Sequence, residues 1–175
     1  MRWDCVQGGE RVKKRIFVII TIVATSVLLL CGCLEEPQGS QEENMQEGKY
    51  QDEEYISWLL SRANVVVEYV NVSVDAAVND EYYLAETYAD HGYDYCLDTI
   101  DDMFTFNLSD DAQQFFEYSY RFFVDAKWFF FYLSLYANTQ SVSDLHEANE
   151  YLEKANHDLE NMTLWLKRWE AEKCP

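Results

Sequence analysis

Apolar residues in the stretch from residue 52 to residue 78 recur every three or four positions. The repeat consists of Ile56, Leu60, Ala63, Val67, Val70, Val74 and Ala77. Such steps keep one face of an α-helix apolar along its length. A shorter alternation of Val70, Val72 and Val74 with polar residues is typical of a strand, but the helical repeat is much longer. We therefore predict a helix here.

The next stretch, residues 80–105, carries small residues on the side that we expect to face the interior. Its repeat is Tyr82, Ala85, Ala89, Gly92, Cys96 and Met103, flanked by Tyr93, Leu97, Ile100 and Phe104. Small side chains on one helix accept large ones from a neighbour, so this face predicts close packing against an aromatic-rich helix. Only Asn79 and Asp80 separate this stretch from the preceding helix, so one long fused helix is an alternative.

Residues 115–136 form the most aromatic part of the chain, with 12 of 22 residues being Phe, Tyr or Trp. They belong to a third predicted helix, residues 109–138, in which Ser109 is the expected N-cap. A helix that is apolar on nearly every side is normally buried. We expect this helix to be the central one of the fold.

A fourth repeat, with strict steps of three and four, follows a polar turn and continues to about residue 173. It consists of Leu145, Ala148, Leu152, Ala155, Leu159, Met162, Leu166 and Trp169. Four such segments joined by short turns predict an all-α domain, an antiparallel four-helix bundle over residues 51–175. The alternative is a three-helix arrangement in which the first two helices are fused.

The first 33 residues have the organisation of an export signal. A basic flank at residues 11–15 precedes an apolar run at residues 16–30. The segment Leu30-Cys31-Gly32-Cys33 resembles the prokaryotic lipobox, and this resemblance implies that Cys33 is the lipidated first residue of the mature protein. An uncleaved signal anchor is the alternative, because the apolar segment is barely long enough to span a bilayer.

Residues 34–50 contain Pro, Gly, Ser, Gln and Glu without a periodic apolar pattern, which predicts a flexible tether. Whether the signal is cleaved or not, the basic flank stays in the cytoplasm. We therefore expect the helical domain to lie on the extracytoplasmic face of the cell membrane, held there by the lipid on Cys33 or by an uncleaved N-terminal helix.

The balance of charge excludes one class of partner. The chain has a formal net charge of −19, and from residue 33 onward it holds 8 basic and 30 acidic residues. A surface of this kind repels phosphate backbones, so we expect no binding to nucleic acid.

Histidine and carboxylate side chains line up on two predicted helices. One set is His146, Glu150, Glu153 and His157, and the other is His91, Asp94, Asp98 and Asp102. Both sets lie away from the apolar repeat of their helix, which is typical of a solvated polar face. The sequence also lacks the nucleophile-elbow, phosphate-loop and His-Glu-x-x-His motifs. We therefore expect a protein without catalytic activity, metal or cofactor.

Cysteine positions and short acceptor motifs add little to this picture. Cys96 lies on the inner side of its predicted helix and Cys174 is the penultimate residue, so a buried thiol and a separate terminal thiol are favoured over a disulfide. The N-glycosylation pattern occurs at Asn71, Asn107 and Asn161, of which Asn107 lies in a predicted turn.

The surplus of aromatic residues is the main functional clue. Residues Trp128, Phe131, Tyr132 and Leu135 lie where polar residues are expected on the third helix, and Trp58 and Tyr69 lie opposite the apolar repeat of the first. One interpretation is core filling in a narrow bundle. The other is an exposed patch, which typically marks a binding site.

These observations lead to a hypothesis of a non-catalytic, membrane-anchored binding module. Its ligand would be a protein partner, a second copy of the chain included, or a small apolar molecule. A structural surface protein without a specific ligand is the first alternative, and an extracytoplasmic metal-binding protein or enzyme is the second.

Overall fold

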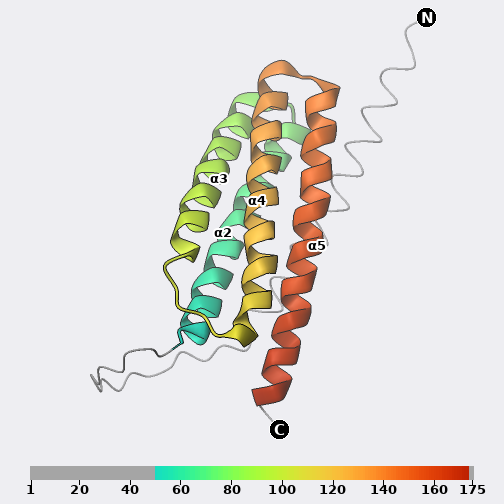
Figure 1. Ribbon diagram of the computed structural model, residues 1–175. Coiled ribbons are helices and arrows are strands. Elements are labelled where there is room, and N and C mark those ends of the chain that lie inside the picture. Colours follow the sequence, from blue (N-terminus) through green and yellow to red (C-terminus); the bar gives the residue numbers. More distant parts are fainter. Residues whose placement is uncertain (1–49, 174–175) are drawn as a thin grey trace, which may run out of the picture.

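The computed structural model describes residues 50–173, and in this part of the chain it contains four helices and no strand. The helices are α2 (Asp52–Val78), α3 (Tyr82–Met103), α4 (Asp110–Thr139) and α5 (Val142–Lys173). Figure 1 shows consecutive helices running antiparallel, which confirms the predicted helical bundle. The predicted signal with Cys33, the tether up to residue 49 and Cys174 lie outside the described residues. Within them, we find no helix with the length and apolar character that crossing a membrane requires.

The break between α2 and α3 is a local backbone motif. Asp80 adopts a left-handed conformation with φ of 61°. The N–H of Glu81 donates to the carbonyl of Ala76 at 2.9 Å, and the N–H of Asp80 donates to that of Ala77 at 3.3 Å. This pair of bonds is the Schellman motif that ends a helix, and Asp tolerates the left-handed position better than most residues. The alternative of one fused helix is therefore wrong.

The loop between α3 and α4 is fastened to the start of α2. The N–H of Gln51 donates to the carbonyl of Asn107 at 2.9 Å. The side chain of Asp52 accepts from the backbone N–H of Ser109 at 2.9 Å and from its hydroxyl at 2.6 Å. Ser109 is the N-cap of α4, as predicted, because its side chain accepts from the N–H of Ala112.

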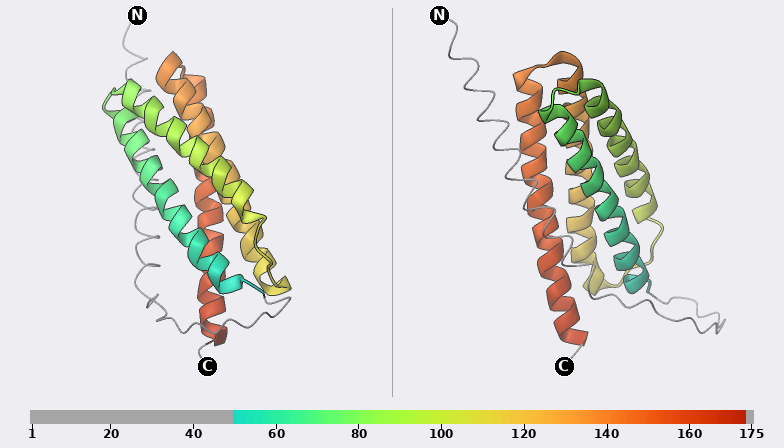
Figure 2. Two further views of the ribbon diagram at one scale, coloured as in Figure 1. Left: turned by 90° about the vertical axis from the view of Figure 1, so that its left-hand side faces the viewer. Right: turned by 180° about the vertical axis from the view of Figure 1, so that it is seen from behind.

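The central position predicted for the aromatic helix is confirmed, because α4 packs against each of the other three helices. The bundle is not a closed square, however. No Cα atom of α2 lies within 8 Å of one in α5. The left view of Figure 2 shows α2 inclined to α5. Large side chains of α4, such as Phe129 and Leu133, are buried between them.

Small residues on α3 allow α4 to approach closely. Gly92 is buried against the ring of Phe130, and a Cβ atom on residue 92 would lie 2.5 Å from that ring. Ala85, Ala89 and Cys96 on the same face of α3 are fully buried. The predicted contact between a small-residue face and an aromatic helix is thus present.

Candidate functional site

Five aromatic rings form a continuous band across the outer side of three helices. Tyr93 of α3 lies 6.3 Å from Phe131 of α4, measured between ring centroids. Phe131 is 5.5 Å from Trp128 and 5.3 Å from Tyr132, and Tyr132 stacks on Tyr151 of α5 at 5.6 Å. We call these five residues the aromatic belt. The belt unites three of the residues that the sequence predicted as a patch, Trp128, Phe131 and Tyr132.

Only part of the belt is open to solvent. Phe131 is 39% exposed, whereas Trp128, Tyr132 and the nearby Leu135 are half-buried. Tyr151 and Tyr93 cover the two sides of the α4 residues, a contribution from neighbouring helices that the sequence of α4 alone does not reveal. The aromatic surplus is therefore divided between core filling and surface.

Lysine side chains lie over two rings of the belt. The Lys127 ammonium is 5.0 Å from the ring centroid of Trp128, and the Lys154 ammonium is 4.3 Å from that of Tyr151. Both are cation–π contacts. They place positive charge beside the belt in a chain that is otherwise strongly acidic.

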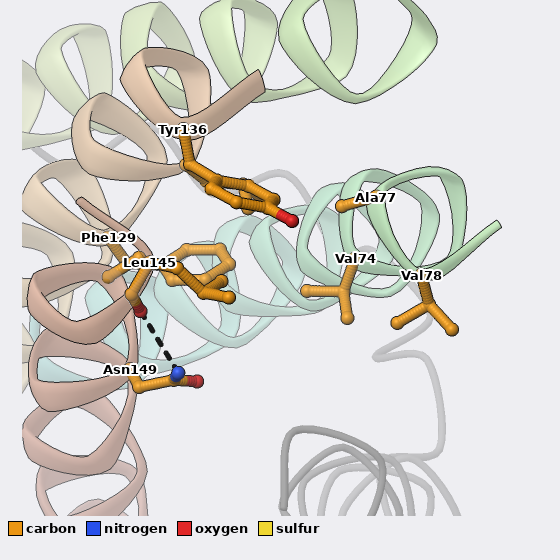
Figure 3. Close-up of a pocket in the computed structure, with 9 residues that line it drawn as sticks. Val74, Ala77, Val78, Phe129, Tyr136, Leu145 and Asn149 are labelled. Atoms are coloured by element: carbon orange, nitrogen blue, oxygen red, sulfur yellow. Dashed lines mark hydrogen bonds between the residues drawn. The ribbon is translucent and has the colours of Figure 1, made fainter. Parts of the chain in front are cut away.

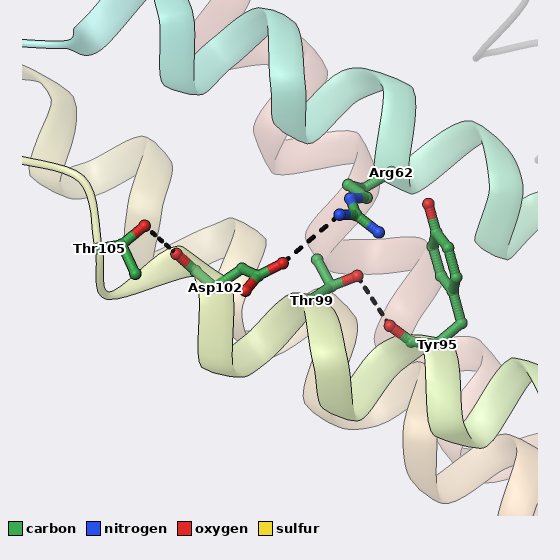
Figure 4. A network of polar contacts seen from close by, with 5 residues as sticks. All are labelled: Arg62, Tyr95, Thr99, Asp102 and Thr105. Atoms are coloured by element: carbon green, nitrogen blue, oxygen red, sulfur yellow. Dashed lines mark hydrogen bonds and ion pairs between the residues drawn. The ribbon is translucent and has the colours of Figure 1, made fainter.

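The other two residues of the predicted patch, Trp58 and Tyr69, lie apart from the belt at the junction of α2 and α3. The Arg62 guanidinium lies 5.3 Å from the Trp58 ring and 5.2 Å from the Tyr95 ring, and Tyr69 is 6.0 Å from Tyr95. Arg62 also forms an ion pair with Asp102 at 3.4 Å (Figure 4). An arginine thus covers Trp58 and Tyr95, and Tyr69 lies beside Tyr95.

Further exposed apolar residues follow the junction of α3 and α4. Leu97 on α3 and Phe104 at the C-cap of α3 are 36% and 64% exposed, and Tyr120 and Phe131 on α4 are 38% and 39% exposed. Phe104 is 5.8 Å from Tyr120 between ring centroids. We call these four residues the α3–α4 strip. It contains both of the exposed phenylalanines among the described residues.

The sequence did not predict this strip. Leu97 and Phe104 flank the apolar repeat of α3, so their spacing is equally consistent with burial. Which flank a neighbouring helix covers depends on the arrangement of the bundle, because a helix has two flanks and the spacing treats them alike.

A narrow apolar crease lies between α2, α4 and α5. Its lining is Val74, Ala77, Val78, Phe129, Leu133, Tyr136, Leu145, Ala148 and Asn149 (Figure 3). The room open to the centre of a water molecule is about 10 Å³, roughly one such position. Pockets that bind drug-sized ligands have volumes of about 300–1,000 Å³. The crease is far smaller, so it holds no small organic molecule in this conformation.

A polar hollow lies between α4 and α5, below the belt. It is lined by Arg121, Asp125, Glu150, Glu153, Lys154, His157 and Asp158. Asp158 is only 6% exposed, and burial raises its pKa. Burial and the neighbouring charge of Asp158 raise the pKa of Asp125.

The two sets of histidines and carboxylates do not converge. His146 pairs with Glu150 at 3.2 Å, while His157 lies in the hollow. On α3, His91 lies beside Tyr69, and Asp102 is engaged by Arg62. Between residues 50 and 173, no group of three or more His, Cys, Asp or Glu side chains has the geometry to hold a metal ion.

The remaining predicted sites are placed as follows. Cys96 is a free thiol with no exposed surface, and burial raises its pKa, so it is not a reactive nucleophile. Its predicted counterpart, Cys174, lies outside the described residues. Asn107 is exposed in the loop between α3 and α4, whereas Asn71 and Asn161 are half-buried within helices.

Comparisons with protein-family models, with curated proteins and with solved structures gave no match to this chain.

Proposed function

We propose that this protein is a lipid-anchored extracytoplasmic module that binds a protein partner and has no catalytic activity. The observation that carries the proposal is the combination of the aromatic belt and the α3–α4 strip on one side of the bundle. Exposed aromatic residues grouped on one face are typical of protein interfaces, in which Tyr, Trp and Phe are enriched.

Three features favour a protein partner over a small apolar ligand or a substrate. The crease between α2, α4 and α5 is too narrow for an organic molecule. The polar hollow mixes carboxylates with Arg121 and Lys154 rather than gathering groups around one reacting position. The thiol of Cys96 is buried and inert. The belt and strip, in contrast, extend over three helices, which suits a macromolecule.

The proposal of a lipid anchor is supported by the resemblance of residues 30–33 to the lipobox. It can be tested directly. Cells that produce the full-length protein are labelled with a radioactive fatty acid. We expect the label on the wild-type protein and on Cys31→Ser, because the lipobox position of Cys31 is variable. We expect no label on Cys33→Ser. Label that persists in Cys33→Ser would contradict the proposal.

The binding surface is tested by a photo-crosslinking amino acid introduced at a single position of the full-length protein in its native membrane. Position 131 lies in both the belt and the strip. Position 72 on α2 is the matched control, because Val72 is 42% exposed against 39% for Phe131. We expect a discrete protein adduct from position 131 only. The absence of any adduct would instead favour a structural surface protein without a specific partner.

A further inference from the structure

We propose that the partner of the α3–α4 strip is a second copy of this chain, related to the first by a two-fold axis that runs along the strip. This inference rests on the proposed function and names the partner of the same surface. In such a dimer, α3 of each copy faces α4 of the other, and Asp94 of one copy lies opposite Lys127 of the other.

The strip has the length and composition of an interface core. One end of the strip is Phe104, which lies against Phe116, and the other end is Phe131, which lies against Tyr93, with ring centroids 5.5 Å and 6.3 Å apart. Residues 116–131 span about 22 Å at a rise of about 1.5 Å per residue. Leu97 and Tyr120 supply exposed apolar surface between these ends.

The two helices of the strip differ in their basic residues, because α4 carries Arg121 and Lys127 together with four carboxylates. α3 contains six carboxylates and no lysine or arginine. Asp94 and Asp101 are exposed, and the turn of about 100° per residue places both on the outward side of α3 next to the strip. On α4, Lys127 lies about one turn before Phe131, and Phe131 packs against Tyr93, the chain neighbour of Asp94 on α3. Lys127 and Asp94 therefore lie within about one helical turn of the same height.

These charges select one of the two possible two-fold arrangements. An axis perpendicular to the helices would place α3 against α3, with six carboxylates on each side and no basic residue on either helix. Like charges placed opposite each other cost several kcal/mol in an interface. An axis parallel to the helices instead places the acidic α3 against α4, and it brings Asp94 and Lys127 together twice.

The parallel axis also suits two chains that are anchored in one membrane. It keeps both copies of α2 pointing the same way, so the two chains enter their bundles at the same end of the dimer (Figure 1). The perpendicular axis would place these two starting points at opposite ends. By random-coil scaling, the predicted tethers of 16 or 17 residues would reach about 20–25 Å, which favours the parallel arrangement.

The size of the strip indicates where this dimer is stable. A surface of about 22 Å by 20 Å, two helices wide, corresponds to about 900 Å² buried in total. Stable interfaces in solution bury about 1,200–2,000 Å². A contact of this size is weak in free solution, but confinement in a membrane raises the effective concentration of the second copy. The test therefore uses the full-length protein in membranes.

The experiment combines two differently tagged copies of the full-length chain, one of which carries a photo-crosslinking amino acid at position 97. We expect an adduct of twice the mass of the chain that contains both tags. Lys127→Glu and Asp94→Lys each replace attraction by repulsion at two symmetric positions, and each should lower the adduct yield about tenfold. The double variant Lys127→Glu/Asp94→Lys should restore the yield.

Lys167→Glu is the matched control, because it makes the same change of charge at an exposed position on α5, away from the strip. Circular dichroism of each variant shows whether the bundle remains folded. A failure of the double variant to restore the yield would overturn the two-fold arrangement. Adducts with a different protein would overturn self-association but leave the proposed function standing, and no adduct from either position 97 or position 131 would overturn both.

Discussion

The two long sides of α3 differ in how their aromatic residues are covered. On the side of α2, the guanidinium of Arg62 lies over Trp58 and Tyr95 and is held by Asp102. On the side of α4, Phe104 and its neighbours in the α3–α4 strip remain exposed. Both sides are rich in aromatic residues, so aromatic content alone does not identify a binding surface. The two sides differ because Arg62 lies over rings on the side of α2, whereas each residue of the strip on the side of α4 is at least 36% exposed.

The first test compares two adjacent residues of α4. Phe130 is fully buried against Gly92, whereas Phe131 is 39% exposed in the strip. We expect Phe130→Ala to lower the free energy of unfolding by about 3–5 kcal/mol, which is the usual cost of replacing a buried Phe by Ala. Phe131→Ala should cost about 1 kcal/mol or less, as surface substitutions do. Denaturant unfolding followed by circular dichroism measures both, and equal losses would contradict the division of α4 into an inner and an outer side.

The second test concerns the close approach of α3 and α4. Gly92→Ala introduces a methyl group that would lie 2.5 Å from the Phe130 ring. We expect a loss of about 1–3 kcal/mol, because a fully buried ring cannot move aside cheaply. Phe130→Leu in the same chain should reduce the additional cost of the methyl group. If Gly92→Ala costs as much stability in the Phe130→Leu protein as in the wild type, the contact between residues 92 and 130 does not set the spacing of α3 and α4.

The third test removes the cover from the side of α2. Arg62→Ala loses two cation–π contacts and one ion pair, and we expect a loss of about 1 kcal/mol in unfolding free energy. Binding of a dye that fluoresces on apolar surface should increase. Arg121→Ala is the control, because Arg121 forms its ion pair with the exposed Glu117 at 3.6 Å, and it should change stability by about 0.5 kcal/mol or less. Equal dye binding by both variants would argue against the covering role of Arg62.

The fourth test has the smallest expected effect and concerns Asp158 at the junction of α4 and α5. Burial raises the pKa of Asp158, so the folded state binds its proton more tightly than the unfolded state does. The cost of the buried charge is fully present above the raised pKa and decreases as the pH falls through it.

We therefore expect Asp158→Asn to stabilise the bundle at pH 7 by about 1 kcal/mol or less. The gain should decrease as the pH falls and should be close to zero at pH 3, below both pKa values, where the wild-type carboxyl group is protonated in both states. Thermal unfolding of both proteins at the two pH values measures this difference. Glu153→Gln, in the same hollow but exposed, is the control. A gain that is equal at both pH values would exclude the buried charge as its cause.

Local patterns predicted the elements of this fold closely. The repeat from Ile56 to Ala77 lies within α2, and the Ser109 cap begins α4 as expected. The break at Asp80 was the weak point, because a left-handed Asp has no sequence signature as clear as Gly. Local backbone chemistry decided that α2 and α3 are separate helices.

The candidate site could be predicted only in part. Trp128, Phe131 and Tyr132 were identified because they lie off the core repeat of α4. Trp58 and Tyr69 met the same criterion, yet the structure places them under or beside Arg62 and Tyr95. Sequence spacing shows that a residue lies off the core repeat, but it does not show which side chain from another helix covers it.

The sequence by itself determined that residues 50–173 form helices with apolar repeats and that α4 is the most aromatic of them. It determined these features because spacing and capping act within one segment of chain. Only the tertiary structure decided that α2 and α5 remain apart, that Arg62 covers one side of α3, and that Leu97, Phe104, Tyr120 and Phe131 remain uncovered on the other. The physical reason is that exposure depends on neighbours that are distant in sequence, and their positions follow from how whole helices pack.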